Sequence, residues 1–285
     1  MKLWRKIMAE NNPTLLLFDV SPFLYIGYWG AVFMLKDRPS ISDEGKVTSV
    51  ATNIIVEKIK NIMQGFEDKP IIPVFVYDGF PQRKLDILKS YKDDRTQRIT
   101  KEVKKALIST VKLFPGFHVI NKDEEADDLI ATILKIYRSS QYFYYINAFI
   151  YTRDNDLMQL SNYKTFVVDP AKDGKLKDRE YLSQKFDGIT NFKHVILHKI
   201  CFGDPSDNIT GIFKGRRRKP IIEQFQTCSK FSEFLNLDIV RERKKQAIDL
   251  FNLIKLRDNL EYDEVFNADQ SMLDFDMNIL KPEKL

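Results

Sequence analysis

Short apolar runs alternate along the chain with longer segments in which apolar residues recur at helical spacing. The runs that predict buried strands are Leu15–Phe18, Ile71–Tyr77, Phe117–Ile120, Tyr142–Thr152 and Tyr163–Val168. Helices are expected at 47–66, 96–114, 129–137, 180–186, 192–202, 221–225 and 240–256, whereas the last twenty-five or so residues are acidic and less periodic. This alternation predicts an α/β protein with a mostly parallel central sheet flanked by helices on both faces.

The segment from Thr14 to Leu35 is apolar enough to resemble a membrane span. Asp19 within it would cost about 2.5–3.5 kcal/mol near a bilayer centre. Pro22, Gly27 and Gly30 also interrupt its pattern. A buried strand followed by a turn fits this segment better than a membrane helix, so no membrane association is expected.

A chain of 285 residues suits either one large α/β domain or one domain with a smaller appendage. We expect a core at residues 14–200 and a helical C-terminal region at residues 201–285. Only two cysteines, Cys201 and Cys228, are present, which is too few for a disulfide framework and indicates a reducing compartment. A cytoplasmic location is therefore expected.

The net charge is +5, but positive charge is concentrated in two segments. Residues 81–112 carry ten Lys or Arg against four acids, and Lys214–Lys219 holds five bases in six residues. Such clusters fit a polyanionic partner. Solvated helix faces would also explain the first segment, whereas five nearly adjacent like charges repel one another unless anions are near.

The stretch Glu125-Ala126-Asp127-Asp128 opens the helix expected at 129–137. One acid in a first helical turn is explained by the helix dipole. Several adjacent acids repel one another, which suggests that a positive species lies between them.

Other acids are expected at the same edge of the predicted sheet. Asp19, Asp78 and Asp154 each end a predicted strand, and ligands of parallel sheets bind beyond the carboxyl ends of the strands. Each acid also has a simpler interpretation, as a turn residue or helix cap, but all of these would have to hold together. The nine candidate carboxylates are Asp19, Asp78, Glu125, Asp127, Asp128, Asp154, Asp156, Asp204 and Asp207.

Nine carboxylates in one cleft cannot all remain ionised without cations. The three histidines are not placed near the acids, so a zinc site is not expected. Oxygen ligands suit Mg²⁺ or Mn²⁺, and two such ions about 3.5–4 Å apart promote in-line phosphoryl displacement.

Taken together, these segments resemble the 5′-nuclease family, which includes phage 5′–3′ exonucleases, RNase H-type primer-removal enzymes and flap endonucleases. The resemblance covers about residues 14–212 and rests on the strand ending at Asp19 and on Tyr77-Asp78-Gly79, Glu125-Ala126-Asp127-Asp128, Asp154-Asn155-Asp156 and Gly203-Asp204-Pro205-Ser206-Asp207-Asn208-Ile209. The short chain looks most like a stand-alone, monomeric phage enzyme, which would work in the host cytoplasm.

The resemblance implies a metal-dependent phosphodiesterase acting on 5′ ends and 5′ flaps of branched, nicked or primed duplex DNA and on RNA primers in RNA/DNA hybrids. Asp78, Glu125, Asp127 and Asp128 would hold one ion, with Asp19 helping through water, and Asp154, Asp156, Asp204 and Asp207 the second. Among these ligands, Asp128 and Asp154 are assigned catalytic roles.

A helical arch at about residues 81–114 is implied as well. In it Lys92 would stabilise charge on the phosphate and Arg95 would clamp a phosphate. DNA contacts are expected from Arg83, Lys84, Tyr91, Lys92, Arg95, Lys214, Arg216, Arg217, Arg218 and Lys219.

The family also has a helix–three-turn–helix that grips duplex backbone and often holds K⁺. Here, at about residues 204–227, the usual glycine-rich turn is replaced by Phe213-Lys214-Gly215-Arg216-Arg217-Arg218-Lys219-Pro220. A K⁺ site is therefore in doubt, and basic side chains would replace backbone amides as phosphate contacts. A single-strand-binding protein or another replication protein is a possible partner.

Two other functions compete with this interpretation. Phe18-Asp19-Val20-Ser21 is similar to the nucleophile strand of haloacid-dehalogenase-like phosphatases, but that family has a second acid where Ser21 stands. A non-catalytic DNA-binding relative would be expected to have lost some acids, yet all nine are present.

Overall fold

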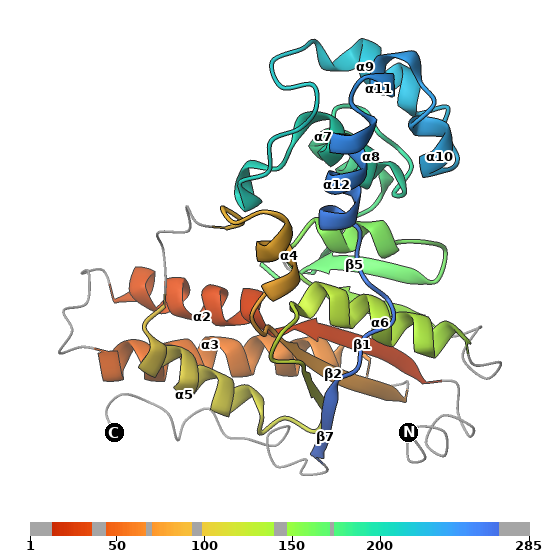
Figure 1. Ribbon diagram of the computed structural model, residues 1–285. Helices are drawn as coiled ribbons and strands as arrows, with labels where there is room; N and C mark the ends of the chain where they lie inside the picture. Colours follow the sequence, from red (N-terminus) through yellow and green to blue (C-terminus); the bar gives the residue numbers. More distant parts are fainter. Residues whose placement is uncertain are drawn as a thin grey trace.

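A seven-stranded mixed sheet forms the centre of the computed structural model, which describes residues 13–35, 44–66, 70–92, 99–139, 147–171 and 174–267 (Figure 1). The strand order is β6-β5-β4-β1-β2-β3-β7. The five central strands are parallel, as predicted: β1 (Thr14–Asp19), β2 (Ile71–Tyr77), β3 (Gly116–Ile120), β4 (Ala148–Tyr151) and β5 (Thr165–Asp169). Two edge strands, β6 (Lys175–Leu176) and β7 (Asp263–Asn267), are antiparallel to their neighbours.

β1 lies between β2 and β4, and its side chains alternate between two hydrophobic cores. Leu15 and Leu17 join one core, while Leu16 and Phe18 join the other. A strand covered on both faces needs apolar residues at every position, which explains the unbroken run Leu15–Phe18. Because the neighbours of β1 are parallel to it, all their carboxyl ends meet at one edge of the sheet.

The segment after β1 was expected to be a turn, but it forms α2 (Val20–Met34), so that prediction is wrong. Pro22 lies in the first helical turn, where no backbone N–H donor is needed. Gly27 and Gly30 do not end the helix; they let it approach α3 (Glu44–Gln64). A Cβ at Gly27 would lie 2.5 Å from Ile55 Cγ1 and 2.8 Å from the Ala51 carbonyl oxygen. Among the described helices, none combines the length and apolarity needed to cross a bilayer.

The remaining helices pack on both faces of the sheet and above it (Figure 1). With α2 and α3, α5 (Lys101–Val111) covers one face and α6 (Ala126–Ser139) the other. The others are α4 (Gln82–Ile87), η2 (Asp156–Leu160), α7 (Arg179–Lys185), α8 (His194–Phe202), η3 (Pro205–Asp207), α9 (Arg218–Phe225), α10 (Phe231–Phe234), α11 (Asp238–Arg241) and α12 (Lys244–Ile254).

Two sequence predictions reach beyond the described residues. Of the arch predicted at 81–114, only the two ends are described, α4 with the turn to Lys92 and residues 99–114 with α5; residues 93–98 lie outside. Of the strand predicted at 142–152, residues 142–146 lie outside as well. The arch and the division of the chain at residue 200 remain predictions.

The region after residue 200 is not helical throughout, because its last described part returns to the sheet. Arg257 N donates to Asp128 Oδ1 at 2.6 Å, and Leu260 N donates to Thr132 Oγ1 at 3.2 Å, so this segment runs along α6. It then pairs with β3 as β7. β7 was not foreseen because it is an edge strand in which Val265 and Phe266 stay 67% and 42% exposed.

The close approach of α2 and α3 predicts opposite effects for two glycine substitutions. Gly27→Ala should lower the free energy of unfolding by about 1–3 kcal/mol, because the added methyl overpacks the helix interface. Gly45→Ala, in the first turn of α3 with nothing within 4 Å of the new Cβ, should raise it by about 0.5–1 kcal/mol. Urea denaturation of both variants measures this, and a Gly27→Ala protein as stable as wild type would contradict the packing.

Candidate metal centre

A hollow of about 370 Å³ opens at the carboxyl ends of β1, β2 and β4. It collects acids from five separate segments, together with Lys92 and Arg153. The structure thereby brings together six of the nine predicted carboxylates: Asp19, Asp78, Glu125, Asp127, Asp154 and Asp207.

The turn after β2 is fixed against the start of α6. Asp78 Oδ1 accepts a hydrogen bond from Ala126 N, the first residue of α6, at 2.9 Å. Gly79 N donates to the Glu124 carbonyl at 2.8 Å. A Cβ at Gly79 would lie 2.0 Å from the Asn121 carbonyl oxygen, so glycine is required where these two segments pass. This contact sets Asp78 beside the acids of α6.

The first strand and the fourth are tied by a buried hydroxyl. Thr152 Oγ1 donates to Asp19 Oδ2 at 2.7 Å and accepts from Asp154 N at 2.9 Å. Burial and the neighbouring Asp78 raise the pKa of Asp19 well above its usual range, although the Thr152 hydroxyl opposes the shift. A cation in the hollow would favour the ionised form of Asp19.

A second group of acids lies beside the first. Asp156, Asp204 and Asp207 each offer one oxygen, and these oxygens lie within 4.8 Å of one another. The buried ammonium of Lys199 pairs with Asp156 and Asp204. Burial, helped by Asp154 and Asp204, raises the pKa of Asp207. Burial also opposes ionisation of Asp204, but Lys199 and Ser206 together hold its pKa below the ordinary value. Because Asp207 also lines the hollow, the two groups are continuous.

Lys84 was predicted to bind DNA, but the structure buries it among the acids. Its Nζ lies 2.7 Å from Glu125 Oε2, 3.0 Å from Asp127 Oδ2 and 3.5 Å from Asp128 Oδ2, and the residue is only 4% exposed. Burial opposes ionisation of Asp127, yet Lys84 and Lys92 hold its pKa below the ordinary value. Lys84 thus balances the charge of these acids, and DNA binding by Lys84 stays a prediction.

Lys92 stands at the wall of the hollow, in the left-handed backbone region at φ 58°. Its ammonium pairs with Glu125 and lies 3.8 Å from Asp207 Oδ1, and Lys92 N donates to the Asp207 carbonyl at 3.3 Å. Tyr91 is buried and donates its hydroxyl to Glu125 Oε2 at 3.0 Å, so it orients an acid. Arg95 lies outside the described residues.

Asp128 and Arg83 stand behind the hollow. Asp128 is fully buried and does not line the hollow, and its Oδ1 accepts a hydrogen bond from Arg257 N. Burial and the neighbouring Asp127 raise the pKa of Asp128 to about 6. Arg83 Nη1 donates to the Asn252 carbonyl at 2.6 Å, and its Nη2 lies 3.5 Å from Asp128 Oδ2. Arg83 therefore ties α4 to α12, a contact that its position in the basic segment did not indicate.

The basic run Lys214–Lys219 is exposed throughout, and its last two residues open α9. Arg218 Nη1 donates to Asp187 Oδ2 at 2.7 Å, and its guanidinium lies over the Phe202 ring at 5.2 Å. The guanidinium of Arg216 likewise lies over the Phe213 ring at 5.7 Å. Of the predicted DNA contacts here, Arg218 thus has protein partners, whereas Lys214, Arg217 and Lys219 are available at the surface.

Three further residues of the site were not singled out from the sequence. Lys199 is a lone lysine in the apolar helix α8, and that isolation was its only signal. Arg153 lines the hollow, and the Ser21 hydroxyl donates to Asp78. Both lie within two residues of a predicted ligand, Arg153 beside Asp154 and Ser21 beside Asp19.

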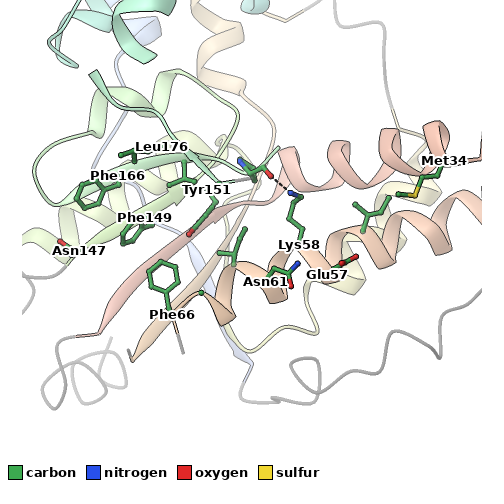
Figure 2. A pocket seen from close by; sticks show the side chains of 16 residues that line it. Met34, Glu57, Lys58, Asn61, Phe66, Asn147, Phe149, Tyr151, Phe166 and Leu176 are labelled. Atoms are coloured by element: carbon green, nitrogen blue, oxygen red, sulfur yellow. Dashed lines mark hydrogen bonds between the residues drawn. The ribbon is translucent and has the colours of Figure 1, made fainter. Parts of the chain in front are cut away.

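A larger hollow of about 870 Å³ lies between α3 and the β4–β5 edge and shares no lining residue with the first (Figure 2). Phe66, Phe149, Tyr151 and Phe166 dominate its wall, and Lys58 donates to the Pro170 carbonyl at 2.7 Å beside it. It lacks convergent acids, so the candidate chemistry belongs to the smaller hollow.

The comparisons with known proteins agree with this geometry. Residues 14–187 match the family described as 5′-3′ exonuclease, N-terminal resolvase-like domain. A curated 5′-3′ exonuclease of Mycoplasma pneumoniae is 34% identical over 130 residues, which are 43% of this chain and 42% of that protein. The match thus spans less than half of that relative's length.

Solved structures share the fold at low identity. A T5 protein co-crystallised with metal ions superposes with a TM-score of 0.58 and 16% identity, covering 85% of this chain and 89% of that one. The bacteriophage T5 flap endonuclease in a pseudo-enzyme–product complex with DNA and metal ions gives 0.60 and 18%, covering 86% and 89%. At these identities the likeness shows the fold, a mixed sheet flanked by helices.

The buried ammonium of Lys84 yields a stability prediction. Lys84→Met should destabilise the metal-free protein by about 3–5 kcal/mol, because it leaves buried carboxylates without their counter-charge. Added Mn²⁺ should restore part of the loss. Lys135→Met, which removes a half-exposed pair with Asp258, is the control and should change stability by at most about 1 kcal/mol. Denaturation of both variants in EDTA and in Mn²⁺ measures these changes in the free energy of unfolding. Equal losses of stability in Lys84→Met and Lys135→Met would show that Lys84 does not balance the acids.

Proposed function

Because the chain belongs to the 5′-3′ exonuclease family with an N-terminal resolvase-like domain, we propose that it is a metal-dependent 5′-nuclease. It hydrolyses phosphodiester bonds at 5′ ends and 5′ flaps of branched or nicked duplexes and removes RNA primers. The family match removes the case for a haloacid-dehalogenase-like phosphatase.

The observation that carries this proposal is the gathering of six carboxylates in one hollow, with no His or Cys among its lining residues. An all-oxygen donor set fits Mg²⁺ or Mn²⁺. Two such ions would polarise a phosphate and lower the pKa of bound water. Asp78, Glu125 and Asp127, with Asp128 behind them and Asp19 acting through water, would hold one ion; Asp154, Asp156, Asp204 and Asp207 would hold the other.

The lysines and arginines of the site have different proposed roles. Lys92 lies at the wall between Glu125 and Asp207, where its ammonium reaches a phosphate oxygen and stabilises charge that develops there. Lys84 and Lys199 are buried against the acids and position them. Arg153 is exposed at the rim and adds a phosphate contact, and Arg95 is proposed as a phosphate clamp.

The exposed bases after α8 would grip the duplex backbone. Lys214, Arg216, Arg217 and Lys219 are the proposed contacts in the variant helix–three-turn–helix. Binding of DNA and RNA/DNA hybrid, a monomeric state, a cytoplasmic location and a replication-protein partner belong to the same proposal. The T5 neighbour solved with DNA and metal ions supports the DNA part.

Substitution of a single hollow residue tests the chemistry. Asp154→Asn and Lys92→Ala should each lower the single-turnover rate on an end-labelled 5′-flap duplex by at least about 100-fold, while the dissociation constant for that duplex, measured in Ca²⁺, stays near wild type. Asp238→Asn, an exposed acid on α11, is the control. Normal turnover by Asp154→Asn in Mg²⁺ would refute the assignment, and a pure binding defect in Lys92→Ala would move that residue from catalysis to grip.

Salt dependence separates free bases from those with protein partners. Arg217→Ala should reduce the slope of log affinity against log salt by about 0.9 for the one phosphate contact that it loses. Arg218→Ala should change the slope less, because Asp187 already holds that guanidinium. Titration of a labelled nicked duplex at several KCl concentrations measures both, and identical slopes for the two variants would contradict this distinction.

A further inference from the structure

One buried ammonium group, that of Lys177, donates hydrogen bonds to the loop between β4 and η2. Lys177 Nζ donates to the Arg153 carbonyl at 2.9 Å, the Asp154 carbonyl at 3.1 Å and Asn155 Oδ1 at 3.1 Å. These three acceptors belong to three consecutive residues. An ammonium has three N–H donors, so the loop satisfies all of them.

The buried position of Lys177 is unfavourable for a charged side chain. It is 1% exposed and ranks among the largest fully buried side chains of the described core. Burying a charge is unfavourable unless hydrogen bonds and nearby opposite charge offset the loss of water. An apolar residue of similar length would avoid that cost but would take away a donor from each of three loop oxygens.

The anchor itself is rigid. Lys177 N donates to the Val167 carbonyl of β5 at 2.8 Å, and the next residue, Asp178, caps α7 by accepting Tyr181 N at 2.9 Å. The Tyr181 hydroxyl then donates to Asn155 Oδ1 at 3.3 Å. The ammonium therefore links a sheet strand and a helix start to the loop.

That loop carries two of the carboxylates proposed to hold a metal ion. Asp154 lines the hollow, and its Oδ1 accepts Asp156 N at 2.8 Å, so the position of one acid fixes the other. Lys177 contacts the backbone and the amide of this loop and lines neither the hollow nor the acid group around Asp204.

We propose that Lys177 is a positioning residue, which fixes the backbone of residues 153–155 so that Asp154 and Asp156 present preformed ligands to a divalent ion. This inference rests on the proposed function. It assigns the buried lysine to metal affinity rather than to DNA binding or to general stability.

The test compares Lys177→Met with Lys58→Met. Lys58 also donates a hydrogen bond to a carbonyl (Figure 2), but its acceptor is Pro170, which lies outside the loop that carries the acids. Mn²⁺ binding to each protein without DNA is measured by electron paramagnetic resonance of the free ion, alongside thermal unfolding in EDTA and flap-duplex binding.

Lys177→Met should weaken binding of one Mn²⁺ by about 10–100-fold, the range for residues that orient metal ligands. Flap binding should stay unchanged, and high Mn²⁺ should recover part of the cleavage rate. Lys58→Met should bind Mn²⁺ as wild type does. A folded Lys177→Met protein with wild-type Mn²⁺ affinity overturns the proposal, as does an equal loss in both variants.

Should Lys177→Met fail to fold, Asn155→Ala decides, because it removes one of the three acceptors and leaves the ammonium in place. Weakened Mn²⁺ binding by Asn155→Ala supports the proposal, and unchanged binding overturns it. Wild-type protein that binds no Mn²⁺ overturns the proposed function, and this inference with it.

Discussion

Repulsion among carboxylates is the constraint on which the rest of the structure depends. Acids at or just after the ends of β1, β2 and β4, at the start of α6 and in η3 meet in one hollow, where their like charges repel one another. Three lysines from separate parts of the fold balance this negative charge, and each pairs with two or more acids. They are Lys84 on α4, Lys92 after α4 and Lys199 on α8. Divalent ions would add the charge that these ammonium groups leave unbalanced.

The arrangement of the sheet turns this constraint into a site. Parallel strands deliver Asp19, Asp78 and Asp154 to one edge, and short contacts between their loops then set the geometry. Gly79 lets the loop after β2 pass the β3–α6 connection, and the Thr152 hydroxyl joins Asp19 to the Asp154 backbone. The end of the described chain takes part too, because Arg257 N holds Asp128 behind the hollow. Charged residues that are far apart in the sequence thus interact electrostatically in one site.

Much of this could be predicted from the sequence because its signals are periodic or positional. Continuous apolar runs identified the five parallel strands, and an acid after a buried strand must lie at the sheet edge. The glycines of α2 gave the wrong signal, because a glycine that ends a helix and one that admits a neighbouring helix look alike in sequence until the neighbour, here Ile55, is known. β7 was missed because an exposed edge strand needs no apolar alternation.

The buried lysines lay beyond sequence reasoning for a different reason. Lys84 and Lys214 both stand in basic segments, yet one ion-pairs with three acids and the other meets solvent. Lys177 lies in a polar stretch whose burial depends on contacts with a loop more than twenty residues earlier. Charge pattern gives the number of cations; tertiary contacts decide which of them balance the acids and which remain for a polyanion.

The most direct test of this account is anomalous diffraction from crystals of the wild-type protein grown with Mn²⁺. The account predicts two anomalous peaks, one among Asp78, Glu125 and Asp127 and the other among Asp156, Asp204 and Asp207. The absence of any peak in the hollow, with its carboxylates in the places described, would contradict it.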